Sequence, residues 1–129
     1  MTPELTALAI AGLVQYAQFF LLAVVTNLTV SPRWTMGPRD EPIDAPIKVG
    51  RLNRALSNHF EGLVLFTIAV VVITLADKGT GLTATCAWIY VASRILYVPA
   101  YFFGLSPWRT FAWAPGFIAT LIMLLSVVI

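Results

Sequence analysis

Two short runs of charged and polar residues interrupt an otherwise apolar sequence, and both repeat at helical spacing. The first run has intervals of three, four and three residues and consists of Arg51, Arg54, Asn58 and Glu61. The second run has intervals of three and four residues and consists of Arg94, Tyr97 and Tyr101. Side chains three or four residues apart project from the same side of a helix. Each run therefore predicts a helix with one polar stripe, here called the first and the second polar stripe.

Together the two stripes offer guanidinium groups, a carboxylate, an amide and two phenols. A guanidinium group binds a carboxylate through two parallel hydrogen bonds, a carboxylate holds an ammonium group, and an amide pairs with a peptide group. A thiol bound beside a guanidinium group is shifted toward the thiolate, which is its nucleophilic form. The two stripes thus suit a small zwitterionic anion and, if that ligand carries a thiol, nucleophilic attack by its sulfur.

The composition places these stripes in a membrane protein. Of the 129 residues, 59% are hydrophobic and 11% are charged, whereas a soluble domain has roughly 45–50% apolar and about 25% charged residues. The mean hydropathy is +0.85. A formal net charge of +2 is too small to indicate a nucleic-acid partner. Because the chain has one cysteine and one histidine, we expect neither an intrachain disulfide nor a metal site.

Stretches without Asp, Glu, Lys or Arg define the spans, since a transmembrane helix needs about 20 apolar residues. Residues 5–32 and 110–129 are long enough by themselves. Two further spans form only if Glu61 and Arg94 lie inside the membrane. The sequence therefore predicts one all-α domain, residues 1–129, folded as an integral membrane four-helix bundle. Its helices are expected near residues 5–29, 48–76, 81–103 and 107–128, with a loop over 30–47.

Basic residues near the ends of the spans predict the orientation, because cytoplasmic ends are enriched in Lys and Arg. Lys78 stands alone at one end. The opposite end carries Arg33, Arg39, Lys48, Arg51, Arg54 and Arg109. We therefore expect the loop 30–47 in the cytoplasm and both termini outside it, in an inner or plasma membrane.

Charged groups inside a span need a partner. A mid-membrane arginine costs roughly 2.5 to more than 10 kcal/mol and normally faces a protein interior or a wet cavity. We expect Glu61 to pair with Arg94, and Gly62 to let helices approach closely. A buried ion pair that only fixes helix register is the alternative to a functional pocket. For Gln15, Gln18 and His59 we expect hydrogen bonds between helices.

The segment Arg54-Ala55-Leu56-Ser57-Asn58-His59-Phe60-Glu61 resembles the Arg-Ala-x-x-Asn-x-x-Glu signature of the MAPEG family, the membrane-associated proteins of eicosanoid and glutathione metabolism, and especially its bacterial branch. The second polar stripe and Arg109 are similar to further family positions. The resemblance implies a homotrimer with glutathione as co-substrate, bound between protomers. It implies glutathione-binding roles for Arg51, Arg54, Asn58, Glu61, Arg94, Tyr97 and Tyr101 and a catalytic role for Arg109. Arg33 is the second candidate catalytic residue, as a substitute for an arginine that several family members have at the inner end of the first helix.

The function expected from this resemblance is a glutathione-dependent transferase or peroxidase that acts on lipophilic electrophiles or hydroperoxides by thiolate attack. Several catalytic members have an arginine at the inner end of the first helix, where this chain has Val30, with Arg33 three residues later. A non-catalytic membrane protein that binds glutathione or a lipid is therefore the alternative. A transporter or channel subunit is less favoured, because the sequence has no inverted repeat. The expected partners are membrane lipid and a lipophilic small molecule, without nucleic acid or metal.

Overall fold

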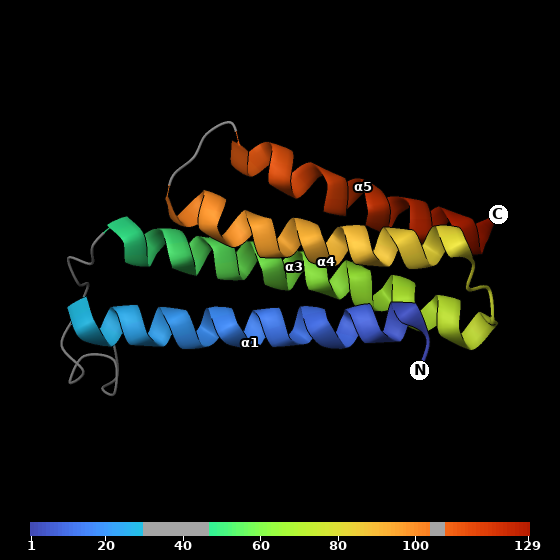
Figure 1. Ribbon diagram of the computed structural model, residues 1–129, viewed down its shortest axis with the longest axis horizontal. Coiled ribbons are helices and arrows are strands. Elements are labelled where there is room, and N and C mark those ends of the chain that lie inside the picture. Colours follow the sequence, from blue (N-terminus) through green and yellow to red (C-terminus); the bar gives the residue numbers. More distant parts are fainter. Residues whose placement is uncertain (30–46, 104–107) are drawn as a thin grey trace.

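The computed structural model describes residues 1–29, 47–103 and 108–129, which form four α-helices (Figure 1). They are α1 (Pro3–Thr29), α3 (Ile47–Ala76), α4 (Gly81–Phe102) and α5 (Trp108–Val128). No helix bound differs from the sequence expectation by more than two residues. The predicted fold class, an all-α membrane four-helix bundle, is confirmed. The predicted loop falls outside the described residues except for Ile47, which begins α3.

All four helices are long and apolar enough to cross a membrane. Their apolar segments are Pro3–Leu28, Asn53–Ala76, Gly81–Ala100 and Thr110–Val128. Large apolar side chains such as Leu13, Phe20 and Leu75 are exposed on the bundle surface, where lipid is their natural solvent. The chain is thus a multi-pass integral membrane protein. Both termini lie at the same end of the bundle, as an even number of passes requires (Figure 1).

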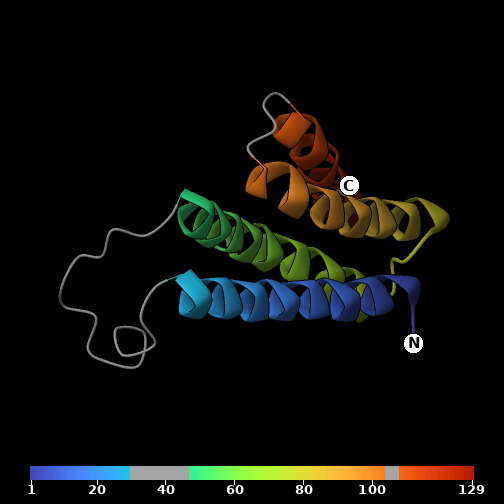
Figure 2. The same cartoon turned by 60° about the vertical axis from the view of Figure 1, so that its left-hand side comes forward.

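The helices α3 and α4 form the centre of the arrangement. Helix α1 packs on α3 and α4 from one side, and α5 packs on the same two helices from the other (Figure 2). The core between them combines small side chains, such as Ala11 and Ala87, with a few large ones. The rings of Phe66 and Tyr90 stack with their centres 4.0 Å apart. The small residues let the helix backbones approach, so that these rings fill the remaining space.

A buried hydrogen bond joins α1 to α3. The side-chain nitrogen Nε2 of Gln18 lies 2.7 Å from Nδ1 of His59, and both side chains are buried. The expected hydrogen bond between helices is confirmed for Gln18 and His59. It is wrong for Gln15, whose buried side-chain amide has no hydrogen-bond partner among the residues that the structure describes. Such a bond fixes the register of the two helices, because a slip would leave polar atoms unpaired in an apolar interior.

The turn between α3 and α4 is closed by two hydrogen-bonded caps. Asp77 ends α3 with a φ of 54°, and the amide of Lys78 donates to the carbonyl of Ile73 at 3.0 Å. This is a left-handed helix end, which Asp tolerates better than most residues other than Gly. At the start of α4, Thr80 and Thr83 cap one another, since each hydroxyl oxygen accepts from the other's amide, at 3.3 and 2.8 Å.

The Thr83 hydroxyl also ties this cap to α1. It donates to Oε1 of Glu4 at 2.6 Å, and the Glu4 side chain is only 3% exposed. A buried carboxylate needs such a donor, because burial without a hydrogen bond costs far more than the bond itself contributes. The Glu4–Thr83 bond therefore stabilises the end of the bundle that carries both termini.

We expect Thr83→Val to lower the free energy of unfolding by about 1–3 kcal/mol, because the isosteric side chain leaves Glu4 without its donor and the Thr80 amide without its acceptor. The matched control is Thr85→Val, since the Thr85 hydroxyl bonds only within its own helix, to the carbonyl of Gly81. Reversible unfolding in mixed micelles measures both variants. Equal losses in the two variants would contradict the role given to the Glu4–Thr83 bond.

Candidate functional site

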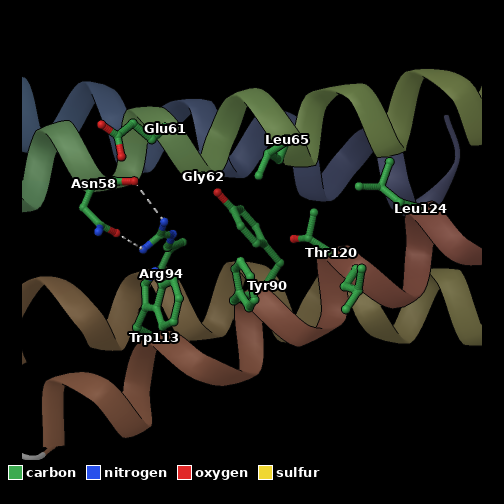
Figure 3. Close-up of a pocket in the computed structure, with 11 residues that line it drawn as sticks. Asn58, Glu61, Gly62, Leu65, Tyr90, Arg94, Trp113, Thr120 and Leu124 are labelled. Carbon is green, nitrogen blue, oxygen red and sulfur yellow. Dashed lines mark hydrogen bonds between the residues drawn. The ribbon is translucent and has the colours of Figure 1, made fainter.

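The bundle brings the two polar stripes together at Arg94 of α4. This side chain lies inside the apolar segment of α4, and it is only 3% exposed. Its Nη1 donates to the side-chain oxygen Oδ1 of Asn58 at 3.1 Å, and its Nη2 donates to the backbone carbonyl of Asn58 at 3.2 Å (Figure 3). A single residue of α3 thus accepts two hydrogen bonds from the buried guanidinium group.

Two aromatic rings complete the surroundings of this guanidinium group. Its central carbon lies 5.6 Å from the ring centre of Tyr90 and 5.4 Å from that of Tyr97. Both tyrosines come from α4, one turn before and one turn after Arg94, and both are buried. A ring face within about 6 Å attracts a cation. The charge is therefore held at a fixed place by neutral groups.

The expected ion pair between Arg94 and Glu61 is not formed. Glu61 is exposed, and no described residue forms a hydrogen bond or an ion pair with its carboxylate. Asn58 is the partner of Arg94 in place of Glu61, because it presents two neutral acceptors opposite the guanidinium group. Burying neutral acceptors costs less desolvation free energy than burying a carboxylate. Figure 3 shows Glu61 beside Asn58 on α3, at the same end of the cavity.

Gly62 makes this arrangement sterically possible. A Cβ atom at this position would lie 2.2 Å from Nη2 of Arg94, which is well inside contact distance. Gly62 therefore permits a close approach, as expected from the sequence, and the group that approaches is the Arg94 guanidinium.

Two cavities meet at Asn58 and Glu61. The Arg94 cavity has a volume of about 310 Å³ and is lined by Asn58, Glu61, Gly62, Leu65, Tyr90, Arg94, Trp113, Phe117, Thr120, Leu121 and Leu124. The Arg54 cavity has a volume of about 300 Å³ and is lined by Asn53, Arg54, Ser57, Asn58, Glu61 and Tyr97. Asn58 and Glu61 belong to both linings. The two cavities are therefore neighbours with a shared polar boundary.

The two cavities differ in chemical character. The Arg54 cavity is lined mainly by polar side chains. Charged and amide groups line the Arg94 cavity only near Asn58, Glu61 and Arg94. Tyr90 and Thr120 add hydroxyl groups, and apolar residues of α3 and α5 line most of the rest (Figure 3). On α5, the rings of Trp113 and Phe117 stack with their centres 4.8 Å apart. This arrangement suits a polar, charged ligand next to an apolar one.

Five of the nine residues expected to form the site line these two cavities: Arg54, Asn58, Glu61, Arg94 and Tyr97. Arg51 lies on α3 one turn before Arg54 and lines neither cavity. Tyr101 and Arg109 belong to α4 and α5, but their side chains are outside the described part of the structure, as is the whole of Arg33.

Sequence reasoning missed two groups of lining residues. Tyr90 precedes Arg94 by four residues, so the helical spacing of the second polar stripe could have included it. Trp113 and Phe117 carry no such signal. An aromatic pair four residues apart on an apolar helix has the same pattern whether it faces lipid or a cavity.

The sequence was compared with known protein families and with curated proteins. Residues 6–129, essentially the whole chain, match the MAPEG family. No curated protein matches the chain.

A double-mutant cycle tests the geometry around Arg94. We expect Asn58→Leu and Arg94→Leu to be coupled by about 1.5–3 kcal/mol of unfolding free energy, because each removes one side of the charged hydrogen bond between Nη1 of Arg94 and Oδ1 of Asn58. The matched cycle of Glu61→Gln with Arg94→Leu should show coupling below about 0.5 kcal/mol. Unfolding in mixed micelles measures both. A larger coupling with Glu61 than with Asn58 would restore the ion pair expected from the sequence.

Proposed function

The chain belongs to the MAPEG family, and from this membership and the two joined cavities we propose that it is a glutathione-dependent transferase or peroxidase. It would act inside the membrane on lipophilic electrophiles or hydroperoxides. The observation that carries the proposal is the buried Arg94 guanidinium, which is fixed by Asn58 at the polar end of a mostly apolar cavity.

The polar groups of the site complement glutathione. This tripeptide carries two carboxylates, an ammonium group, two peptide groups and a thiol. Arg54 can bind a carboxylate, and the Asn58 amide can pair with a peptide group. Two of the five N–H donors of Arg94 bind Asn58. A ligand thiolate beside this guanidinium would be favoured over the neutral thiol.

Glu61 supports a ligand with a positive group. Its carboxylate lies within the apolar segment of α3 and pairs with no residue that the structure describes. A charged group at membrane depth normally has a partner. The ammonium or an amide donor of glutathione would supply that partner, and Glu61 stands at the boundary of both cavities to receive it.

The proposed reaction begins when the tripeptide lies in the Arg54 cavity with its sulfur near Arg94. The Arg94 cavity then holds the apolar acceptor. With an aryl halide, the thiolate forms a carbon–sulfur bond while the carbon–halogen bond breaks, and halide leaves. With a hydroperoxide, the sulfur takes the terminal OH group as the O–O bond breaks, which gives a sulfenic acid and an alkoxide. The alkoxide takes up the proton that the thiol released and leaves as an alcohol. A second glutathione then yields the disulfide and water. Arg109 and Arg33 are the proposed catalytic arginines, and Arg51 and Tyr101 are proposed to support glutathione binding.

We also propose a homotrimer in an inner or plasma membrane, with residues 30–47 in the cytoplasm and both termini outside it. In this assembly glutathione binds between protomers and the second substrate enters from the lipid. The exposure of Glu61 in the single chain supports a site that a neighbouring protomer completes.

A binding protein without turnover is the second candidate. It is favoured by Val30, which occupies the place of the first-helix arginine found in several catalytic members. Such a protein would keep the arginine site and bind glutathione or a lipid without reacting.

Glutathione titration tests the binding half of the proposal. We expect Glu61→Gln to weaken glutathione binding about tenfold, because a hydrogen bond to a charged group contributes about 1.5–3 kcal/mol. Asp77→Asn is the control, since Asp77 is an exposed acid outside both cavities. Calorimetry in detergent measures the dissociation constants. Equal affinity in wild type and Glu61→Gln would remove this carboxylate from the site.

Turnover tests the catalytic half. Purified protein with glutathione should consume aryl halides or lipid hydroperoxides faster than a detergent blank, and Arg109→Leu should lower the rate without unfolding the protein. Product formation is followed by chromatography. Saturable glutathione binding without any turnover would select the binding protein instead.

A further inference from the structure

Ser93, the neighbour of Arg94 in α4, bonds to the backbone of α5. Its side chain is 5% exposed. The amide of Gly116 donates to the Ser93 hydroxyl oxygen at 3.2 Å, and the hydroxyl in turn donates to the carbonyl of Ala112. Residues 112 and 116 are one helical turn apart, so their carbonyl and amide are the two groups that pair in an uninterrupted α-helix. The Ser93 hydroxyl thus bridges one turn of α5 from outside.

This bridge lies at the least supported point of α5. Pro115 is inside the helix and brings no N–H to its hydrogen-bond ladder. Gly116, the next residue, admits the serine, because a Cβ atom there would lie 2.8 Å from Oγ and 3.1 Å from Cβ of Ser93. The proline weakens the helix, and the glycine allows a group of α4 to support it.

The supported turn carries the aromatic wall of the Arg94 cavity. Trp113 and Phe117 lie on either side of the Pro115–Gly116 pair, and both line that cavity. The Ser93 oxygen also lies 3.5 Å from the backbone carbonyl of Trp113. The position of the wall therefore depends on the same backbone that Ser93 holds.

We propose that Ser93 is a positioning residue that fixes the turn of α5 around Pro115 and thereby holds Trp113 against the Arg94 cavity. Without the hydroxyl, residues 108–114 pivot at Pro115, and Trp113 leaves its place in the wall of the Arg94 cavity. Ser93 itself does not touch a ligand in this scheme; it acts through α5.

Hydrogen exchange at one amide tests the support directly. Pro115–Gly116 is the single Pro-Gly sequence in the chain, so carbonyl-¹³C proline with ¹⁵N glycine gives one NMR correlation that reports the Gly116 amide. In Ser93→Ala this amide should exchange about tenfold faster, since it loses its acceptor from α4. In Ser93→Thr, which keeps a hydroxyl, the rate should return to within about threefold of wild type.

The control is Ser126→Ala, because the Ser126 hydroxyl also belongs to α5 but bonds within it, to the carbonyl of Met123 at 2.7 Å. It should leave Gly116 exchange unchanged. A Ser93→Ala rate equal to that of wild type would overturn the proposal.

The wall itself is followed by ¹⁹F NMR with fluorotryptophan. The chain has four tryptophans, and Trp113→Phe assigns the signal. Ser93→Ala should shift or broaden the Trp113 signal and leave in place the signal of Trp88, which belongs to α4. Faster Gly116 exchange with an unmoved Trp113 signal would show that Ser93 supports α5 without positioning the wall, which also overturns the proposal.

A kinetic measurement rests on the proposed function, whereas the two NMR measurements do not. In an active enzyme, Ser93→Ala should raise KM for the apolar acceptor about fivefold and leave KM for glutathione unchanged. Equal changes in both KM values would contradict a role confined to the wall. An inactive wild type would refute the proposed catalysis and leave the NMR result to decide the role of Ser93.

Discussion

The site depends on how a guanidinium group keeps its hydrogen bonds where water is scarce. Arg94 must find its acceptors within the bundle, since an unpaired charge at membrane depth is costly. Asn58 supplies two oxygens from one residue, and Gly62 leaves the space in which the guanidinium reaches them. Because both acceptors are neutral, the cation keeps its full charge toward the neighbouring cavity. A carboxylate in the same place would have cancelled much of it.

Because Arg94 binds Asn58 and not Glu61, the residue that holds the guanidinium group in place is different from the acidic residue that faces the cavities. Asn58 holds Arg94 in place, so Glu61 is not needed for that purpose and stands at the boundary between the two cavities. The site therefore presents positive charge from Arg94 and Arg54 and negative charge from Glu61 at separate points. A zwitterionic ligand with both signs can satisfy them together, whereas a simple anion would meet repulsion from the carboxylate.

The helices and the polar stripes could be predicted from the sequence, but the pairing across helices could not. Charge-free stretches determine where a span begins and ends, because the cost of placing charge in lipid exceeds any local preference. Helical spacing correctly put Asn58 and Glu61 on one stripe. Which of them faces Arg94 depends on the rotation and height of α3 relative to α4, and these follow from packing at glycines and alanines. Ser93 was also missed, because a single hydroxyl in an apolar helix belongs to no periodic pattern.

Helix α4 connects these features because two of its polar side chains contact α3 and α5, each of them beside a glycine. Arg94 reaches α3 at Gly62, and Ser93 reaches α5 at Gly116. Tyr90 lies between the two contacts: its hydroxyl would be 3.5 Å from a Cβ at position 62, and its ring carbon Cδ2 would be 3.5 Å from a Cβ at position 116. A close-packed ring transmits displacement rather than absorbing it. A shift of α5 at Pro115 would therefore move the surface beside Tyr90, which stacks on Phe66 and lies beside the Arg94 guanidinium. One aromatic residue thus lies between the apolar wall and the charged group of the site.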